Sequence, residues 1–134
     1  DWDKYERLKG IKNLVGDVIA LRTGKSKGSF GLREQDLKIG HFNNDTKILS
    51  YVRGNGEPVL MVFNFSSRDF IDYGIGMEEN RNWQLRFDSS WKGYDKDFLD
   101  IDVEGMSIIE AGTDGKQWTG KLNIPGYSCQ IYTL

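Results

Sequence analysis

Residues 59–65 (VLMVFNF) are the feature of this sequence that most limits how the chain can fold. The segment is almost entirely apolar, with β-branched and aromatic side chains, a composition typical of a strand that is buried on both faces. Alternate side chains of a strand share a face, which gives two sets: Val59, Met61, Phe63 and Phe65 on one side, Leu60 and Val62 on the other. A small antiparallel domain usually buries only one face of each strand, so this strand needs a partner on its second face.

The surrounding sequence predicts more strands with short connections. Residues 54–57 (GNGE) have the composition of a tight turn, which makes residues 47–66 a β-hairpin. Other segments with a period of two, or with strand composition between turns, are 37–41, 70–76, 82–88, 99–103, 106–111, 116–124 and 127–134. In segment 82–88 the alternation places Trp83, Leu85 and Phe87 on the inner face. This spacing predicts an all-β fold, an antiparallel Greek-key β-sandwich of about eight strands.

A single helix is predicted ahead of the strands, at Trp2–Arg22. Apolar residues recur there every three or four positions and form one stripe: Trp2, Tyr5, Leu8, Ile11, Val15, Val18 and Ile19. Gly10 and Gly16 each weaken a helix by about 1 kcal/mol relative to Ala, so we expect the helix to depend on docking. Residues 23–29 form a polar linker, which divides the chain into a helical segment, 1–29, and a β-domain, 30–134.

Composition argues against several classes of partner. The chain has 18 basic and 20 acidic residues, a net charge of −2, without the clustered positive charge of nucleic-acid or membrane-surface binding. We therefore expect no nucleic acid and no membrane as partners. The single cysteine, Cys129, cannot form an internal disulfide, and a cytoplasmic location is the default expectation. No signal segment or membrane span is recognisable in the sequence.

Candidate catalytic and metal-binding residues favour structural roles. The acidic run from Asp95 to Glu104 has apolar residues between its carboxylates and lacks the central glycine of a calcium loop, so we interpret it as a solvated strand face. His41 is the only histidine and is expected to be a hydrogen-bonded structural residue. Cys129 is expected to be a buried core thiol. The sequence shows no catalytic constellation, and we expect neither a metal nor a cofactor.

Two aromatic residues lie in a loop rather than on a strand. Trp91 and Tyr94 belong to residues 89–95 (SSWKGYD), where flat rings would be available to stack on sugars or to contact a neighbouring domain. The alternative is that the loop folds back and its rings cover one end of the core.

Several segments, taken in order, resemble the C-terminal all-β domain of the α-amylase superfamily, glycoside hydrolase family 13. They are 17–22 (DVIALR), 31–33 (GLR), 41–44 (HFNN), 47–53 (KILSYVR), 59–66 (VLMVFNFS), 73–76 (YGIG), 83–90 (WQLRFDSS), 91–95 (WKGYD) and 124–128 (IPGYS). The likeness extends over essentially the whole chain and is strongest to α-amylases and 1,4-α-glucan branching enzymes. One departure is DSS at 88–90, where relatives often have Asn-Ser-Asp.

The resemblance implies that the catalytic residues lie on a (β/α)8 barrel of the same polypeptide, outside these residues. Residues 1–29 would be a remnant of the last barrel helix, and the parent protein would hydrolyse or transfer α-1,4-glucan chains. We expect this domain to buttress the barrel, with Trp2, Tyr5, Leu8, Ile11, Leu60 and Val62 as docking residues. In the strand at 59–65 either Leu60 and Val62, or the residues on the Phe63 side, are expected to lie toward the helix. The alternatives are an α-glucan-binding module that uses Trp91 and Tyr94, and a free-standing interaction sandwich.

Overall fold

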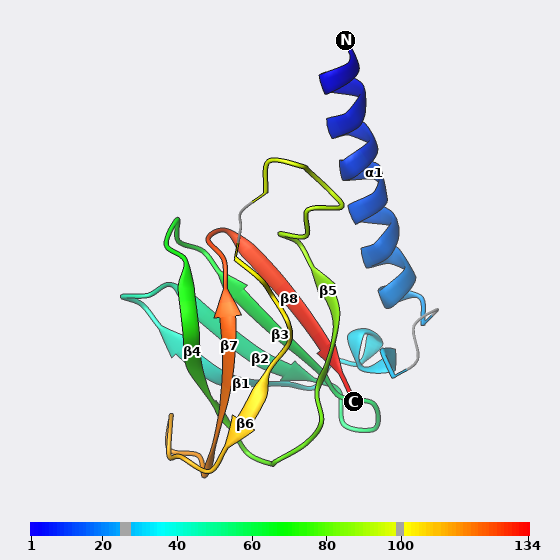
Figure 1. Ribbon diagram of the computed structural model, residues 1–134. Helices are drawn as coiled ribbons and strands as arrows, with labels where there is room; N and C mark the ends of the chain where they lie inside the picture. Colours follow the sequence, from blue (N-terminus) through cyan, green and yellow to red (C-terminus); the bar gives the residue numbers. More distant parts are fainter. Residues whose placement is uncertain (25–27, 99–100) are drawn as a thin grey trace.

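The computed structural model describes residues 1–24, 28–98 and 101–134. Within these ranges a single α-helix, α1 (Trp2–Arg22), precedes a short 3-10 helix, η1 (Phe30–Arg33), and two β-sheets (Figure 1). The strands are β1 (Leu37–Asn43), β2 (Ile48–Arg53), β3 (Val59–Asn64), β4 (Phe70–Met77), β5 (Gln84–Asp88), β6 (Ser107–Ile109), β7 (Trp118–Ile124) and β8 (Ser128–Thr133). Helix α1 lies beside the sandwich, and its N-terminal half projects beyond the sheets.

The strands form an antiparallel sandwich, as predicted. One sheet has the order β1-β2-β3-β8-β5 and the other β4-β7-β6. β3 is the centre of the larger sheet, paired with β2 on one side and with β8 on the other. The predicted hairpin of β2 and β3 is present, in the register Ile48↔Asn64 to Arg53↔Val59.

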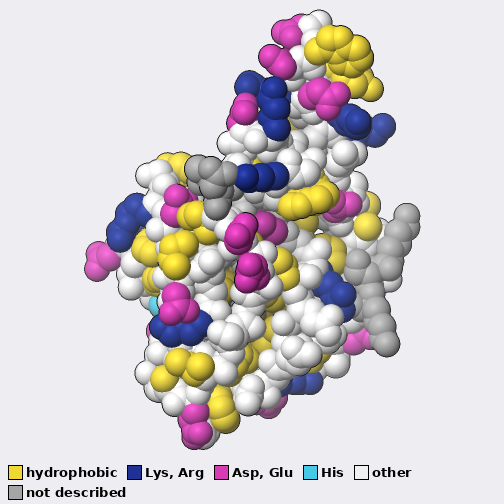
Figure 2. All heavy atoms as spheres, viewed as in Figure 1, with side chains coloured by type: hydrophobic (Ala, Val, Ile, Leu, Met, Phe, Trp, Pro, Cys, Tyr) yellow, Lys and Arg dark blue, Asp and Glu magenta, His cyan; other side chains and the backbone are white. Residues whose placement is uncertain are grey.

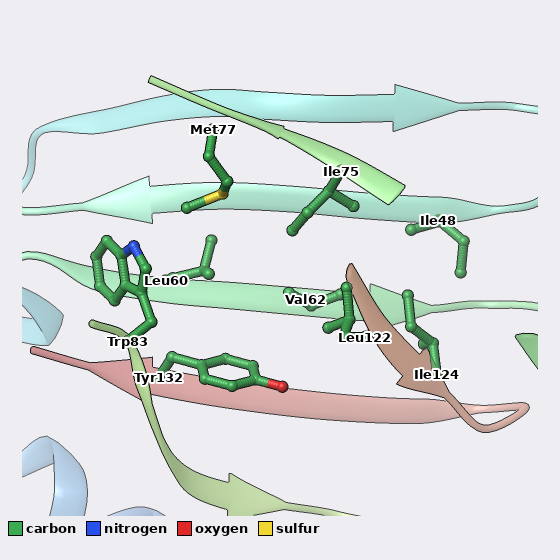
Figure 3. Packing of buried hydrophobic residues seen from close by; sticks show 9 residues of the cluster. All are labelled: Ile48, Leu60, Val62, Ile75, Met77, Trp83, Leu122, Ile124 and Tyr132. Carbon is green, nitrogen blue, oxygen red and sulfur yellow. The ribbon is translucent and has the colours of Figure 1, made fainter. Parts of the chain in front are cut away.

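The core between the sheets contains one of the two apolar sets of β3. Leu60 and Val62 are 1 % and 0 % exposed and pack with Ile75 and Leu122 of the smaller sheet (Figure 3). The prediction that Leu60 and Val62 dock on a neighbouring domain is therefore wrong. Alternation along β3 directs both side chains at the second sheet, where each buried aliphatic group contributes about 1.5–3 kcal/mol.

The other face of β3 has the second partner that its composition predicts. Val59 is fully buried in a separate cluster with Leu21 of α1 and Leu32 of η1. Phe87, Tyr94 and Ile131 complete this cluster, which we call the helix-side cluster. At its Val59 end, β3 is thus a layer between the sandwich core and the helical segment.

Two local predictions are wrong. The register of β5 against β8 shifts between Leu85 and Phe87, so Leu85 packs on the sandwich core whereas Phe87 joins the helix-side cluster. A bulge of this kind inserts an extra residue and reverses the faces that simple alternation assigns. The strand expected at 99–103 is not found at residues 101–103, where the Asn123 side chain donates a hydrogen bond to the Asp102 carbonyl (3.0 Å), and Leu99 lies outside the described residues.

Candidate docking surface

The C-terminal half of helix α1 packs on the sandwich through one narrow face. Leu21 is buried and Leu14 half-buried against the helix-side cluster, and Gly10 is buried against the backbone of Tyr94. Asp17, on the same face, accepts a hydrogen bond from the Tyr94 hydroxyl. These positions are three or four residues apart, so they share one side of the helix.

The predicted apolar stripe lies on the other side of α1 and is exposed. Trp2 is 78 % exposed and Ile11 61 % exposed. The other members of the stripe are also exposed: Tyr5, Leu8, Val15, Val18 and Ile19. Figure 2 shows hydrophobic side chains at the free tip of the helix. At about 100° per residue the stripe points roughly 140° away from the packed face, so α1 has apolar residues on two sides and covers only one.

The helix that carries this stripe is well defined at both ends. Asp1 caps it by accepting a hydrogen bond from the Asp3 amide (3.1 Å). Thr23 ends it, with its hydroxyl donating to the Ile19 carbonyl (2.8 Å). Ser29 then returns the chain to the sandwich by donating to the Leu21 carbonyl (2.9 Å). The exposed stripe is therefore displayed on an ordered helix rather than on a frayed terminus.

A second apolar surface lies on the outer face of the larger sheet, at the end of that face that is distant from the helix. Tyr51, Phe63 and Phe65 stack in a row, with ring centroids 5.8 Å and 5.6 Å apart. Phe42 is 70 % exposed and Ile39 62 % exposed on the adjacent strand β1. The contribution of β3 to this surface is predictable from its residue types. Phe42 lies on the same outer face as Ile39 only because the register of β1 shifts between Ile39 and His41.

The loop after β5 separates the two aromatic residues that the sequence brought together. Tyr94 is 8 % exposed and belongs to the helix-side cluster, and its burial, together with the bond to Asp17, raises the pKa of its hydroxyl. The prediction that Tyr94 is a platform for sugar stacking is therefore wrong, because its ring covers the end of the core. Trp91 remains 57 % exposed and meets Tyr94 edge-on, at 5.1 Å between ring centroids.

His41 has the structural role that was predicted. It is 7 % exposed, with Nδ1 2.7 Å from the Asp114 carboxylate and Nε2 2.8 Å from the Tyr73 hydroxyl. Asp114 also accepts from the Gly76 amide (2.7 Å), and Tyr73 also contacts the Thr46 hydroxyl (2.9 Å). This network ties edge strand β1 to edge strand β4 of the other sheet. Sequence spacing could not identify Asp114 and Tyr73 as partners, because they lie 73 and 32 residues away.

Cys129 is half-buried on the outer face of β8, beside the helix-side cluster. Burial, and to a lesser degree the nearby Asp88 carboxylate, raises the pKa of its thiol to about 12. A thiol that stays protonated at neutral pH is a poor nucleophile.

In the described part of the acidic run, Asp97 lies 3.7 Å from Arg7 of α1. No group of three or more His, Cys, Asp or Glu side chains within the described residues is arranged to hold a metal ion.

The described residues contain no helix that is long and apolar enough to cross a membrane.

Comparison with known proteins agrees with this architecture. Residues 39–134 match the family described as alpha amylase, C-terminal all-beta domain. The chain is also 34 % identical, over 137 aligned residues, to the 1,4-alpha-glucan branching enzyme GlgB of Corynebacterium diphtheriae. That alignment covers 95 % of this chain and 18 % of the relative, so the chain spans about a fifth of the relative's length. A two-sheet antiparallel sandwich and a match over most of its length lead to one conclusion: the chain belongs to the C-terminal all-β domain family of the α-amylases.

Proposed function

We propose that this chain is the C-terminal structural domain of a 1,4-α-glucan branching-enzyme-like protein and that it packs on a catalytic (β/α)8 barrel of the same polypeptide. The parent would hydrolyse or transfer α-1,4-glucan chains, and this domain would supply stability rather than catalytic groups. The likeness to a branching enzyme supports the activity of the parent. Residues 1–29, with α1, would belong to the barrel side of the boundary, and residues 30–134 would form the domain that supports it.

The observation that carries this proposal is the exposed stripe of α1. Seven large apolar side chains face solvent on a helix whose opposite side is already packed on the sandwich. So many large apolar side chains exposed along one ordered helix favour an interface there. A barrel helix needs such a stripe, because its inner side covers the strands of the barrel.

Deletion of the sandwich from the parent tests the buttress role. A parent enzyme that ends after residue 29 should have a clearly lower melting temperature, since Leu14 and Leu21 of α1 would lose the sandwich residues on which they pack. An unchanged melting temperature would contradict a stabilising role. Measured glucan transfer at low temperature, where the shortened enzyme is still folded, should persist because no catalytic group has been removed.

A second candidate function is binding of α-glucan at Trp91. Its ring is 57 % exposed and is held in place by the edge of Tyr94 and by the backbone of Gly93, so it is a preformed surface for a sugar ring. Affinity electrophoresis in glycogen or amylopectin gels tests it. Retardation that is lost on Trp91→Ala would support this function, and equal mobility with and without glucan would exclude it.

We also propose a cytoplasmic location. One free, half-buried thiol suits a reducing compartment, because the fold does not depend on a disulfide. A fusion of the full-length protein to a fluorescent reporter, followed by fractionation, would test this location.

A further inference from the structure

The outer face of strands β1, β2 and β3 is apolar at every position of two successive cross-strand rows. Residues that pair in an antiparallel ladder share a face of the sheet. One row contains Phe42, Leu49 and Phe63, and the next contains Ile39, Tyr51 and Met61. Phe65 extends the surface beyond the end of β3 and stacks on Phe63, with ring centroids 5.6 Å apart. We call the set of Ile39, Phe42, Leu49, Tyr51, Phe63 and Phe65 the aromatic face.

The aromatic face is large enough to be an interface. Phe42 is 70 % exposed, Ile39 and Phe65 are each 62 % exposed, and the other three members are half-buried. Since an aromatic side chain has roughly 150–250 Å² of surface, the accessible apolar area of this face is on the order of 500 Å². The largest apolar patch of a typical monomer is about 300–600 Å² and is often functional. None of the six side chains is charged, so an apolar surface is the occupant that fits.

Strand β3 connects the aromatic face to the contact that helix α1 already makes. Val59 and Met61 lie on the same side of β3 as Phe63 and Phe65. Val59 belongs to the helix-side cluster with Leu21 of α1, and Met61 packs against that cluster. The outer side of β3 is therefore covered at its Val59 end and open at its Phe65 end. An occupant of the aromatic face would continue the interface that α1 begins.

The direction of the exposed stripe shows which part of the polypeptide can reach this face. Helix α1 lies on the outer side of the larger sheet, because it packs on outer side chains of β3, β5 and β8. Its stripe points roughly 140° away from the packed face, so the rest of a barrel that uses this stripe lies beyond the outer side of the sheet. A barrel of about 250 residues is about 45 Å across, whereas five strands span about 20 Å. Such a barrel therefore extends over the aromatic face.

The outer side chains of β3 become larger with distance from α1. Val59 and Met61 lie at the helix-side cluster, whereas Phe63 and Phe65 lie beyond it, with their rings within 7° of parallel. The outer ring of helices in a barrel is convex, so its surface curves away from a sheet on either side of the helix that touches it. Large aromatic side chains would span the wider gap to the next helix of the ring.

We propose that the aromatic face docks on a second helix of the catalytic barrel of the same polypeptide, next to the place that α1 takes in the outer ring. This inference rests on the proposed function and adds a contact that the sandwich itself makes. The chain covers 18 % of its branching-enzyme relative, so a polypeptide of that length has room for a whole barrel. One helix provides a single line of contact, whereas two adjacent helices would also fix the rotation of the sandwich about α1.

Hydroxyl-radical footprinting of the 134-residue chain and of the full-length polypeptide, measured by mass spectrometry, tests this contact. Oxidation of Phe42 and Phe65 should be several-fold slower in the full-length protein, as should oxidation of Trp2 and Tyr5 in the stripe of α1. Protection of Trp2 and Tyr5 alone would overturn this inference and leave the proposed function in place. Protection of neither surface would contradict both. Protection of Phe42 and Phe65 that increases with the concentration of the 134-residue chain would make a second copy the occupant and would also overturn the inference.

Phe42→Lys and Ile71→Lys form a matched pair of variants. Phe42 is 70 % exposed and Ile71 65 % exposed, and they lie on edge strands of different sheets, β1 and β4. Phe42→Lys should lower the melting temperature of the full-length protein by several degrees, because its ammonium group would be buried against the barrel, and should hardly change that of the 134-residue chain. Ile71→Lys should have little effect in either context. An equal, small effect of Phe42→Lys in both contexts would contradict docking at the aromatic face.

Discussion

The carbonyl oxygen of Tyr94 occupies the space where a Cβ atom on Gly10 would lie, so helix α1 and the loop after β5 meet backbone to backbone. The Tyr94 hydroxyl reaches further along the same helix and donates to Asp17. A single loop residue therefore fixes the helix at two points, about two turns apart. These two contacts set the direction in which the exposed stripe faces.

Substitution of the two helix glycines should have opposite effects. Gly10→Ala should destabilise the chain, because the new methyl group overlaps with the Tyr94 carbonyl and separates the helix from the loop. Gly16→Ala should stabilise it by about 1 kcal/mol, since the new methyl group would meet no atom outside its own helix within 4 Å and Ala favours the helix. Urea unfolding of both variants measures this difference. Stabilisation by Gly10→Ala would show that the close contact is absent in solution.

The His41 network should contribute strongly to the contact between edge strands β1 and β4. His41→Ala removes the contacts to Asp114 and Tyr73 from a site that is 7 % exposed, and should cost about 3 kcal/mol. Tyr73→Phe removes only the hydroxyl and should cost about 1 kcal/mol. Because the residues share a hydrogen bond, the double variant should lose less than the sum of the two. Strict additivity in urea unfolding would contradict a coupled network.

Stability should decline in alkaline solution, first through Cys129. Its thiol ionises near pH 9.0 in an unfolded chain and at about 12 in the fold. Below pH 9 the thiol is protonated in both the folded and the unfolded chain, so its contribution to the free energy of unfolding is complete. As the pH rises from 9 towards 12, the unfolded chain loses the proton first and the free energy of unfolding falls. Burial also raises the pKa of Tyr94 and of Tyr132, so these hydroxyls should add to the decline above pH 10.

Melting temperatures measured between neutral pH and about pH 11 check this pH dependence. Cys129→Ala should flatten the curve between about pH 9 and 10 and leave the decline at higher pH in place, because the tyrosines are unchanged. A Cys129→Ala curve parallel to that of the unmodified chain would show that the thiol has no raised pKa in the fold.

Much of the fold follows from short-range patterns in the sequence. The helix at Trp2–Arg22 and the two apolar sets of β3 are visible as periodicities, and the structure confirms both. The assignment of faces was less predictable. By composition, either face of β3 could lie in the core: the face with Leu60 and Val62, or the face with Phe63. Only the position of the second sheet determines which face is buried between the sheets.

The candidate sites depend more on tertiary contacts. Residue types identified Trp91 and Tyr94, but the hydrogen bond from Tyr94 to Asp17 spans 77 residues and buries one of the two rings. The bulge before Phe87 is another feature without a local signature, since a perfect alternation surrounds it.

The most direct test of the docking proposal compares Ile11→Asp in two contexts: the 134-residue chain and the full-length polypeptide. Ile11 is 61 % exposed in the 134-residue chain, so the substitution should hardly change the melting temperature of that chain. In the full-length protein the same carboxylate would be buried against the barrel, and the melting temperature should fall by several degrees. Asn13→Asp adds the same charge outside the stripe and should be silent in both. An equal, small effect of Ile11→Asp in the two contexts would contradict the proposal that the stripe of α1 docks on a barrel.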